Sequence, residues 1–221
     1  MTRAQVTVLV ALVFGAWWFW MVVAGNSIGI EQFSPFSFAV TILLFAVTAF
    51  NEHLWRWPLF RNFLSNRPVL AGLWKVEIKS TFFDEQTGKG KLIEGYYLIR
   101  QNYSGLSIRF FTRETTSKTQ SAQLVKTEDG KWALEGTYLD TPAASYQGGS
   151  PMHFGAFSLL LAAHPVVKTF EGRYWTSRQT QGVVRSLARV AATGEAASEI
   201  SGYELAESLF IKLSKKRWFN C

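Results

Sequence analysis

Alternation between apolar and polar side chains runs through most of this chain, from residue 72 to about residue 191. The alternating segments are rich in β-branched and aromatic residues, and clusters of Gly, Asn, Asp and Pro separate them. Short turns at 102–105 and 128–130 favour sequential antiparallel hairpins. Eight strands are predicted, at residues 73–81, 92–102, 106–113, 118–127, 131–140, 152–162, 168–177 and 182–190.

Eight up-and-down strands can close on themselves, which removes the exposed sheet edges. A barrel of this size either fills with side chains or holds one small ligand. The start of the first segment, Gly72-Leu73-Trp74, resembles the Gly-x-Trp start of lipocalin-type barrels, in which the tryptophan plugs the closed end. The pattern therefore predicts an eight-stranded antiparallel up-and-down β-barrel with a pocket.

The N-terminal part has a different pattern, with two runs free of charged residues at 6–24 and 33–50. At 1.5 Å per residue, each run has nearly the length that a membrane core of roughly 30 Å requires. Trp17, Trp18 and Trp20 are typical of an interfacial belt and argue against a cleaved signal peptide. We therefore predict two transmembrane helices that form a hairpin.

Basic residues flank this hairpin but are missing from the loop between the two runs. Arg3 precedes the first run, and Arg56, Arg61 and Arg67 follow the second. The positive-inside rule then predicts a multi-pass membrane protein with its N-terminus and C-terminal domain in the cytoplasm. Because neither run contains an ionisable residue, the helices are expected to anchor or assemble and not to form a substrate pathway.

A short amphipathic helix is predicted after the barrel. Residues 201–204 have the form of a capping box, and Leu205, Leu209 and Leu213 recur every four residues. The basic and aromatic tail at 212–219 suits a membrane surface or a partner subunit. The predicted fold is thus a membrane-anchored all-β protein. Its expected parts are a transmembrane hairpin (1–54), a basic juxtamembrane linker (55–71), the barrel (72–191) and the C-terminal helix with its tail (192–221).

Composition and motifs limit the chemistry. The chain has 23 Lys and Arg against 16 Asp and Glu, a net charge of +7 that favours lipid head groups, nucleotides or nucleic acid as partners. Cys221 is the single cysteine, so no intrachain disulfide can form. The three histidines, His53, His153 and His164, have no ligand cluster beside them. With no nucleotide-hydrolase or esterase motif, we expect neither an enzyme, nor a metal site, nor a cofactor.

Polar residues on predicted strands are the candidates for ligand binding. In the seventh segment, Tyr174, Thr176 and Arg178 share one face. If that face points inward, the barrel interior contains a phenol, a hydroxyl and a guanidinium. These groups suit a planar base that stacks and a phosphate that accepts paired hydrogen bonds. Tyr138 and the stretch 113–117 add similar groups.

Taken together, two apolar runs, a short loop and a strand-rich domain resemble the two-transmembrane, β-strand-rich effectors of cyclic-oligonucleotide-based anti-phage signalling (CBASS), which are associated with CD-NTases. The phrases that carry the resemblance occur in order at residues 72–74, 99–104, 113–117, 134–138, 153–155 and 170–178. The resemblance implies that a phage-activated nucleotidyltransferase makes a cyclic dinucleotide and that the barrel binds it. The resemblance further implies that the protein lies in the bacterial inner membrane, that it then forms a homo-oligomer that disrupts inner-membrane lipid, and that the infected cell dies. No nucleic-acid polymer is expected as a partner.

Under this resemblance the ligand-binding residues have distinct expected roles in a wet, positively charged barrel interior. Arg113 and Arg178 are expected to pair with phosphates through their guanidinium groups. The hydroxyls of Thr115, Ser117 and Thr176 are expected to bond to phosphate or ribose. The phenol rings of Tyr103, Tyr138 and Tyr174 are expected to stack on bases.

Two other functions fit the same pattern. A membrane-tethered, lipocalin-like carrier of an apolar ligand predicts an interior lined by residues such as Phe110, Leu134 and Phe157. A non-catalytic scaffold predicts a fully packed barrel without a pocket of ligand size. The polarity and the volume of the interior distinguish these alternatives.

Overall fold

The computed structural model describes residues 3–23, 25, 33–60, 66–84, 89–148, 150–162, 165–192 and 195–218. The chain divides into two compact units. Unit 1 comprises residues 1–66 with 102–105, and unit 2 comprises residues 67–101 with 106–221. The predictions that rest on the loop 26–32, Arg61, His164, Phe219 and Cys221 fall outside the described residues.

Unit 1 contains two long helices, α1 (Arg3–Val23) and α2 (Phe33–Glu52), followed by the short helices η2 (Leu54–Arg56) and α3 (Pro58–Phe60). Aromatic side chains pack together at the C-terminal end of α2. Trp55 is fully buried, and the Tyr103 ring packs edge-on against Phe50 at 5.1 Å and against Trp55 at 6.3 Å. The turn 102–105 thus packs with this unit through its aromatic side chain.

The prediction of a transmembrane hairpin is wrong. The two runs form helices as expected, but within the described residues no helix is both long enough and apolar enough to cross a membrane. The multi-pass inner-membrane localisation and the membrane-anchored fold class, which depended on this hairpin, are corrected with it. The physical reason is that lack of charge is a weaker condition than continuous apolar character. Polar residues such as Thr7, Thr41 and Thr48 interrupt the apolar sequence of the two runs.

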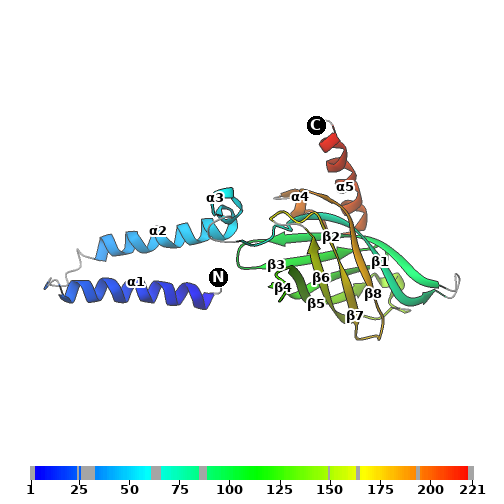
Figure 1. Ribbon diagram of the computed structural model, residues 1–221, viewed down its shortest axis with the longest axis horizontal. Helices are drawn as coiled ribbons and strands as arrows, with labels where there is room; N and C mark the ends of the chain where they lie inside the picture. The colour runs from blue at the N-terminus through cyan, green and yellow to red at the C-terminus, as the bar shows by residue number, and fades with distance from the viewer. Residues whose placement is uncertain are drawn as a thin grey trace. The chain divides into compact units, whose positions relative to one another are not determined.

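Unit 2 is a closed barrel of eight antiparallel strands in which each strand pairs with its neighbour in sequence and β1 pairs with β8 (Figure 1). The strands are β1 (Gly72–Asp84), β2 (Lys89–Gln101), β3 (Leu106–Phe111), β4 (Thr115–Lys126), β5 (Trp132–Pro142), β6 (His153–Ala162), β7 (Thr169–Thr176) and β8 (Gln181–Val190). The eight predicted strands and their up-and-down order are confirmed. A short helix, η4 (Ala144–Tyr146), lies in the connection between β5 and β6.

One end of the barrel interior is densely packed. Trp74 is fully buried there, its ring lies 5.0 Å from Phe170, and its Nε1–H donates to the Leu70 carbonyl oxygen at 2.8 Å. The Arg189 guanidinium lies 5.0 Å from the Trp74 ring and donates to the Val69, Ala71 and Val167 carbonyl oxygens. The tryptophan therefore plugs this end, as the lipocalin-like start predicts.

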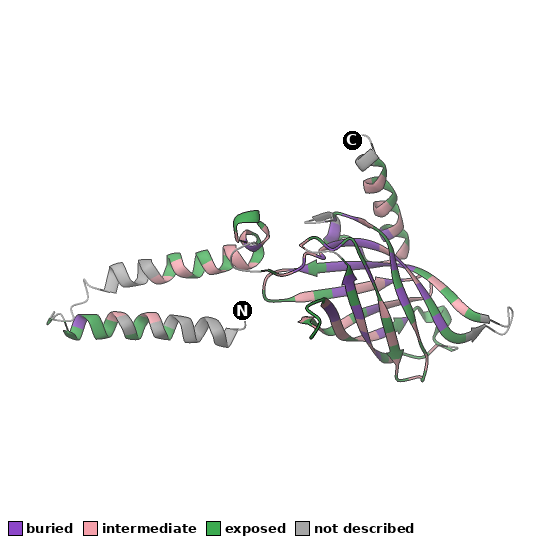
Figure 2. Cartoon of the chain, in the orientation of Figure 1, coloured by how far each residue is buried: buried purple, intermediate pink, exposed green. Residues whose placement is uncertain are grey.

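The outer wall of the barrel is covered at one place by the C-terminal helices α4 (Glu195–Ser198) and α5 (Tyr203–Trp218) (Figure 1). Ala206 is fully buried in a cluster with residues of β1, β2, β3 and β8, and Phe210 packs against that cluster. The predicted helix is confirmed, but Leu205 is 51% exposed and so does not belong to the buried stripe. In Figure 2 the buried residues recur along each strand, as a two-residue period requires.

Candidate functional site

The other end of the barrel interior is hollow. A cavity of about 430 Å³ is lined by residues of β1 to β7 and of the connections β3–β4, β5–β6 and β7–β8. This volume falls in the range of small-molecule pockets. The wall is made of Ile78, Ser80, Phe82, Lys91, Ile93, Tyr97, Ile108, Phe110, Thr112, Glu114, Thr115, Ser117, Thr119, Tyr138, Asp140, Tyr146, Ser150, His153, Phe157, Tyr174, Thr176, Arg178 and Thr180.

Strand periodicity explains which side chains face the cavity. On β4, every second residue from Thr115 to Thr119 lines it, and on β5 the same spacing brings Tyr138 and Asp140 to the wall. Successive Cβ atoms of a strand point to opposite faces of a sheet, so one inward residue determines the others. The residues that line the cavity are therefore determined by their position in the strand alternation as much as by their type.

Aromatic rings lie over glycines of neighbouring strands on this inner wall, and this arrangement helps to keep the cavity open. The pairs are Gly95 with Phe110, Gly136 with Phe157, Gly155 with Tyr138, and Gly182 with Tyr174. At each of these glycines, a methyl group would overlap the ring. A missing side chain thus gives each ring room to lie against the strands and not across the cavity.

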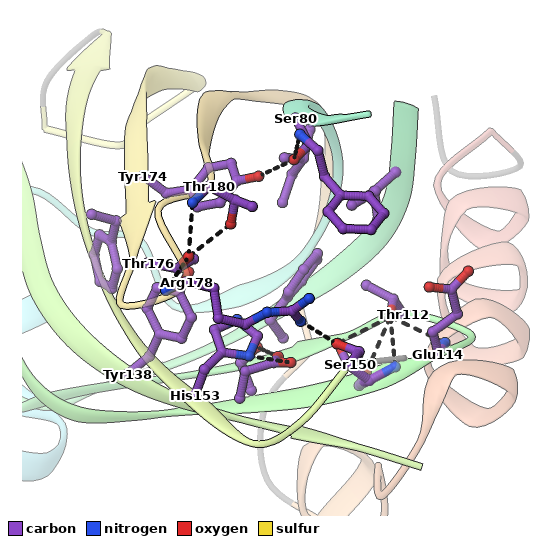
Figure 3. A pocket seen from close by; sticks show the side chains of 18 of the residues that line it. Ser80, Thr112, Glu114, Tyr138, Ser150, His153, Tyr174, Thr176, Arg178 and Thr180 are labelled. Atoms are coloured by element: carbon purple, nitrogen blue, oxygen red, sulfur yellow. Dashed lines mark hydrogen bonds and ion pairs between the residues drawn. The ribbon is translucent and has the colours of Figure 1, made fainter. Parts of the chain in front are cut away.

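Hydroxyl groups line the rim near the β7–β8 turn. The Tyr174 hydroxyl donates to Ser80 Oγ at 2.7 Å, and the Thr176 and Thr180 hydroxyls are 2.7 Å apart. Arg178 Nη1 donates to Ser150 Oγ at 2.6 Å, so the guanidinium reaches from the turn towards the β5–β6 connection (Figure 3). This rim offers a cation beside several hydroxyls, a combination that suits a phosphate group.

Charges of both signs line the cavity. Lys91 Nζ is 2.6 Å from one carboxylate oxygen of Glu114, and the buried Asp140 accepts a hydrogen bond from Ser117 Oγ. With His153 neutral, Lys91 and Arg178 balance Glu114 and Asp140, so the formal charge of the lining is zero. The expectation of a positively charged interior is wrong, because carboxylates of β5 and of the β3–β4 turn face the same space as the cations.

Burial raises the pKa of three tyrosines of the wall. Desolvation is the main cause for Tyr97, Tyr138 and Tyr174, and the neighbouring phenols of Tyr138 and Tyr174 raise the pKa of Tyr97 further. These phenols stay protonated at neutral pH. Their hydroxyl groups can therefore donate hydrogen bonds, and their rings offer neutral faces for stacking.

The structure brings six of the eight predicted ligand-binding residues to the cavity wall. These are Thr115, Ser117, Tyr138, Tyr174, Thr176 and Arg178. Their contact with a ligand stays a prediction, but their positions on one wall agree with it.

Tyr103 and Arg113 lie elsewhere. Tyr103 is in the β2–β3 turn, at the end of its strands opposite to the one that forms the cavity, and packs against Phe50 and Trp55. Arg113 has the outward parity of Phe111, and its guanidinium lies 5.4 Å from the ring of Tyr203 on α5. Neither side chain forms part of the wall.

Sequence reasoning missed several polar residues of the wall, among them Lys91, Asp140 and His153. Asp140 lies two residues after Tyr138, so the alternation of that segment already indicated it. His153 is opposite Asp140 in the β5–β6 register, which the sequence did not specify. In the part of the chain that the structure describes, no group of three His, Cys, Asp or Glu side chains could hold a metal ion.

The sequence of this barrel matches a known protein family. Residues 65–187 match the family described as Cap15, cyclic dinucleotide receptor domain. The chain belongs to this Cap15 family. The match begins ahead of β1 and ends within β8, so it includes every residue of the cavity wall.

One known protein is similar to this chain over a comparable length. CD-NTase-associated protein 15 of Staphylococcus schleiferi is 28% identical over 149 residues, which cover 67% of this chain and 76% of the relative. The family match and this relative support the resemblance to CBASS effectors that the sequence phrases indicated.

Proposed function

We propose that the hollow end of the barrel binds a cyclic dinucleotide and that the chain is an effector of CBASS anti-phage defence. The observation that carries the proposal is the position of the cavity within the match to the Cap15 cyclic dinucleotide receptor domain. Stacking faces, hydroxyls and a guanidinium meet in that cavity, and these groups suit bases, riboses and phosphates.

The proposed roles follow the positions of the side chains. Arg178 binds a phosphate, because its guanidinium already forms a hydrogen bond at the rim with Ser150 and can exchange that hydroxyl for a phosphate oxygen. Tyr138 and Tyr174 stack on bases. The hydroxyls of Thr115, Ser117 and Thr176 bond to ribose or phosphate. Arg113 and Tyr103 are left out of this site because they are not on its wall.

Binding is tested by isothermal titration of the full-length chain with a panel of cyclic dinucleotides. Arg178→Ala should weaken binding by about 1.5–3 kcal/mol, or roughly tenfold to a hundredfold, because a charge-assisted hydrogen bond is lost. Arg113→Ala is the matched control, since it removes the same group outside the cavity, and its affinity should equal that of the wild type. Equal affinity in Arg178→Ala and wild type contradicts the assignment.

We further propose that ligand binding promotes assembly into a homo-oligomer that disrupts the inner membrane and kills the infected cell. The resemblance to CBASS effectors supports this step. Light scattering with and without the ligand measures assembly. Uptake of a membrane-impermeant dye, in bacteria that express the chain with a matching nucleotidyltransferase, measures membrane damage. Absence of dye uptake when ligand and chain are both present contradicts the membrane step alone.

A carrier of an apolar ligand is the second candidate, because Ile78, Phe110 and Phe157 also line the cavity. A fluorescent fatty acid distinguishes the two functions. Under the proposal, a cyclic dinucleotide binds in preference to the fatty acid, and Arg178→Ala affects the dinucleotide alone. A fully packed scaffold is disfavoured, because the cavity has the volume of a ligand site.

A further inference from the structure

Asp140 is the buried carboxylate of the cavity wall, with 5% of its surface exposed. Ser117 Oγ donates to its Oδ1, and its Oδ2 lies 3.9 Å from His153 Nδ1. That distance is too long for a hydrogen bond. His153 Nδ1 is 3.1 Å from the Pro151 carbonyl oxygen, which suits the tautomer with a proton on Nδ1. Asp140 therefore keeps acceptor capacity that a ligand can use.

A stacking surface lies beside this acceptor. Tyr138 is two residues before Asp140 on β5, and its ring lies over Gly155 of β6. Phe157 is roughly parallel to it, with ring centroids 6.3 Å apart. Residues two apart on a strand are separated by roughly 7 Å. A base that stacks on Tyr138 can thus present one edge to the Asp140 carboxylate.

The carboxylate restricts which edge can bind. An ionised carboxylate only accepts hydrogen bonds. Guanine presents two adjacent donors on its Watson–Crick edge, N1–H and the 2-amino group, which match the two oxygens of a carboxylate. Adenine places an unprotonated ring nitrogen beside its amino group, and uracil places a carbonyl oxygen on each side of its N3–H. These acceptors face the carboxylate unfavourably.

We infer that Asp140 is a specificity-determining residue that selects a guanine-containing cyclic dinucleotide. The inference rests on the proposed function and names the ligand class for the same site. It also assigns the phosphates and the guanine base of the ligand to different parts of the cavity. Phosphates are repelled by Asp140 and bind towards the rim at Arg178, whereas the guanine edge lies deeper, between Tyr138 and the Ser117–Asp140 pair.

Titration of the full-length chain with cyclic di-GMP, cyclic di-AMP and cyclic di-UMP tests the inference. The wild type should bind cyclic di-GMP at least tenfold more tightly than the other two ligands, since a matched pair of hydrogen bonds to a base is worth that much discrimination. Cyclic di-IMP keeps N1–H but lacks the 2-amino group, and should bind with intermediate affinity. Equal affinity of the wild type for all these ligands overturns the inference without any variant.

Asp140→Asn sharpens the test, because the amide oxygen can still accept from Ser117 while the second oxygen becomes a donor. It should weaken cyclic di-GMP at least tenfold and leave cyclic di-AMP unchanged or tighter. Asp129→Asn, in the exposed β4–β5 turn, is the matched control and should change neither affinity. An unchanged preference in Asp140→Asn overturns the inference while the proposed function stands. Absence of binding for every cyclic dinucleotide removes both.

Discussion

The two ends of the barrel interior share the same strands but differ in what their inward residues do. At the packed end, Trp74, Leu134, Leu159 and Phe170 fill the space between the strands. At the hollow end, glycines alternate with aromatic and polar residues, and the rings lie on the glycines. One barrel thus divides its interior between stability and binding, and residues such as Ile78, Tyr97 and Phe157 belong both to the buried core and to the cavity wall.

The largest expected effect is at the packed end. Trp74→Ala should lower the free energy of unfolding by about 3–5 kcal/mol, because it removes a large buried side chain and leaves a cavity. Trp175→Ala is the matched control on the outer wall, where the side chain is 50% exposed, and should cost about 1 kcal/mol or less. Chemical denaturation measures both. Similar losses would break the distinction between packed interior and solvated wall.

A smaller effect is expected at the hollow end from added volume. Gly155→Ala should cost about 1–3 kcal/mol of stability, because its methyl group overlaps the Tyr138 ring and pushes it towards the cavity. Ligand affinity should fall as the cavity narrows. Gly202→Ala, where nothing lies within 4 Å of the added group, should change neither quantity. A double-mutant cycle with Tyr138→Ala should show coupling between positions 138 and 155, and additivity would contradict the ring-on-glycine arrangement.

The buried tyrosines predict a loss of stability in alkali. Because burial raises the pKa of Tyr97, Tyr138 and Tyr174, the folded state holds their protons more tightly than the unfolded state. The stabilisation is therefore complete below the ordinary tyrosine pKa of about 10 and is lost as the pH rises above it. Denaturation at a series of pH values measures the slope. Tyr138→Phe should flatten this slope, because it removes one of the three buried phenols.

The smallest effect is expected at the cavity rim. Glu114→Gln breaks the ion pair with Lys91, whose side chains are 41% and 31% exposed, and should cost less than about 1 kcal/mol. The released Lys91 should raise affinity for an anionic ligand, most strongly at low salt. Glu171→Gln breaks a comparable pair with Arg185 and is the control, since neither residue lines the cavity. An unchanged salt dependence in Glu114→Gln would contradict the role of Lys91.

Strand order and side-chain parity, both readable from the sequence, could have predicted more of the site than the eight candidate residues did. Up-and-down strands place successive turns at opposite ends, so the β2–β3 turn with Tyr103 and the β7–β8 turn near Arg178 cannot share one end. Parity along β3 turns Phe110 and Thr112 inward and Phe111 outward, which indicates an outward Arg113. Asp140 follows from Tyr138 by the same rule. In contrast, the two uncharged runs at the N-terminus led to a wrong prediction of transmembrane helices, because lack of charge was the criterion.

The sequence by itself determined the eight strands, their order and the C-terminal helix, since alternation, turn residues and helical spacing of apolar residues act between residues close along the chain. Only the tertiary structure decided which end of the barrel is hollow and which charges meet there. That outcome depends on cross-strand register, which pairs Tyr138 with Gly155 and Asp140 with His153. Register and ring closure are properties of the whole barrel, because each strand is positioned by two neighbours and β1 meets β8 only when the sheet closes.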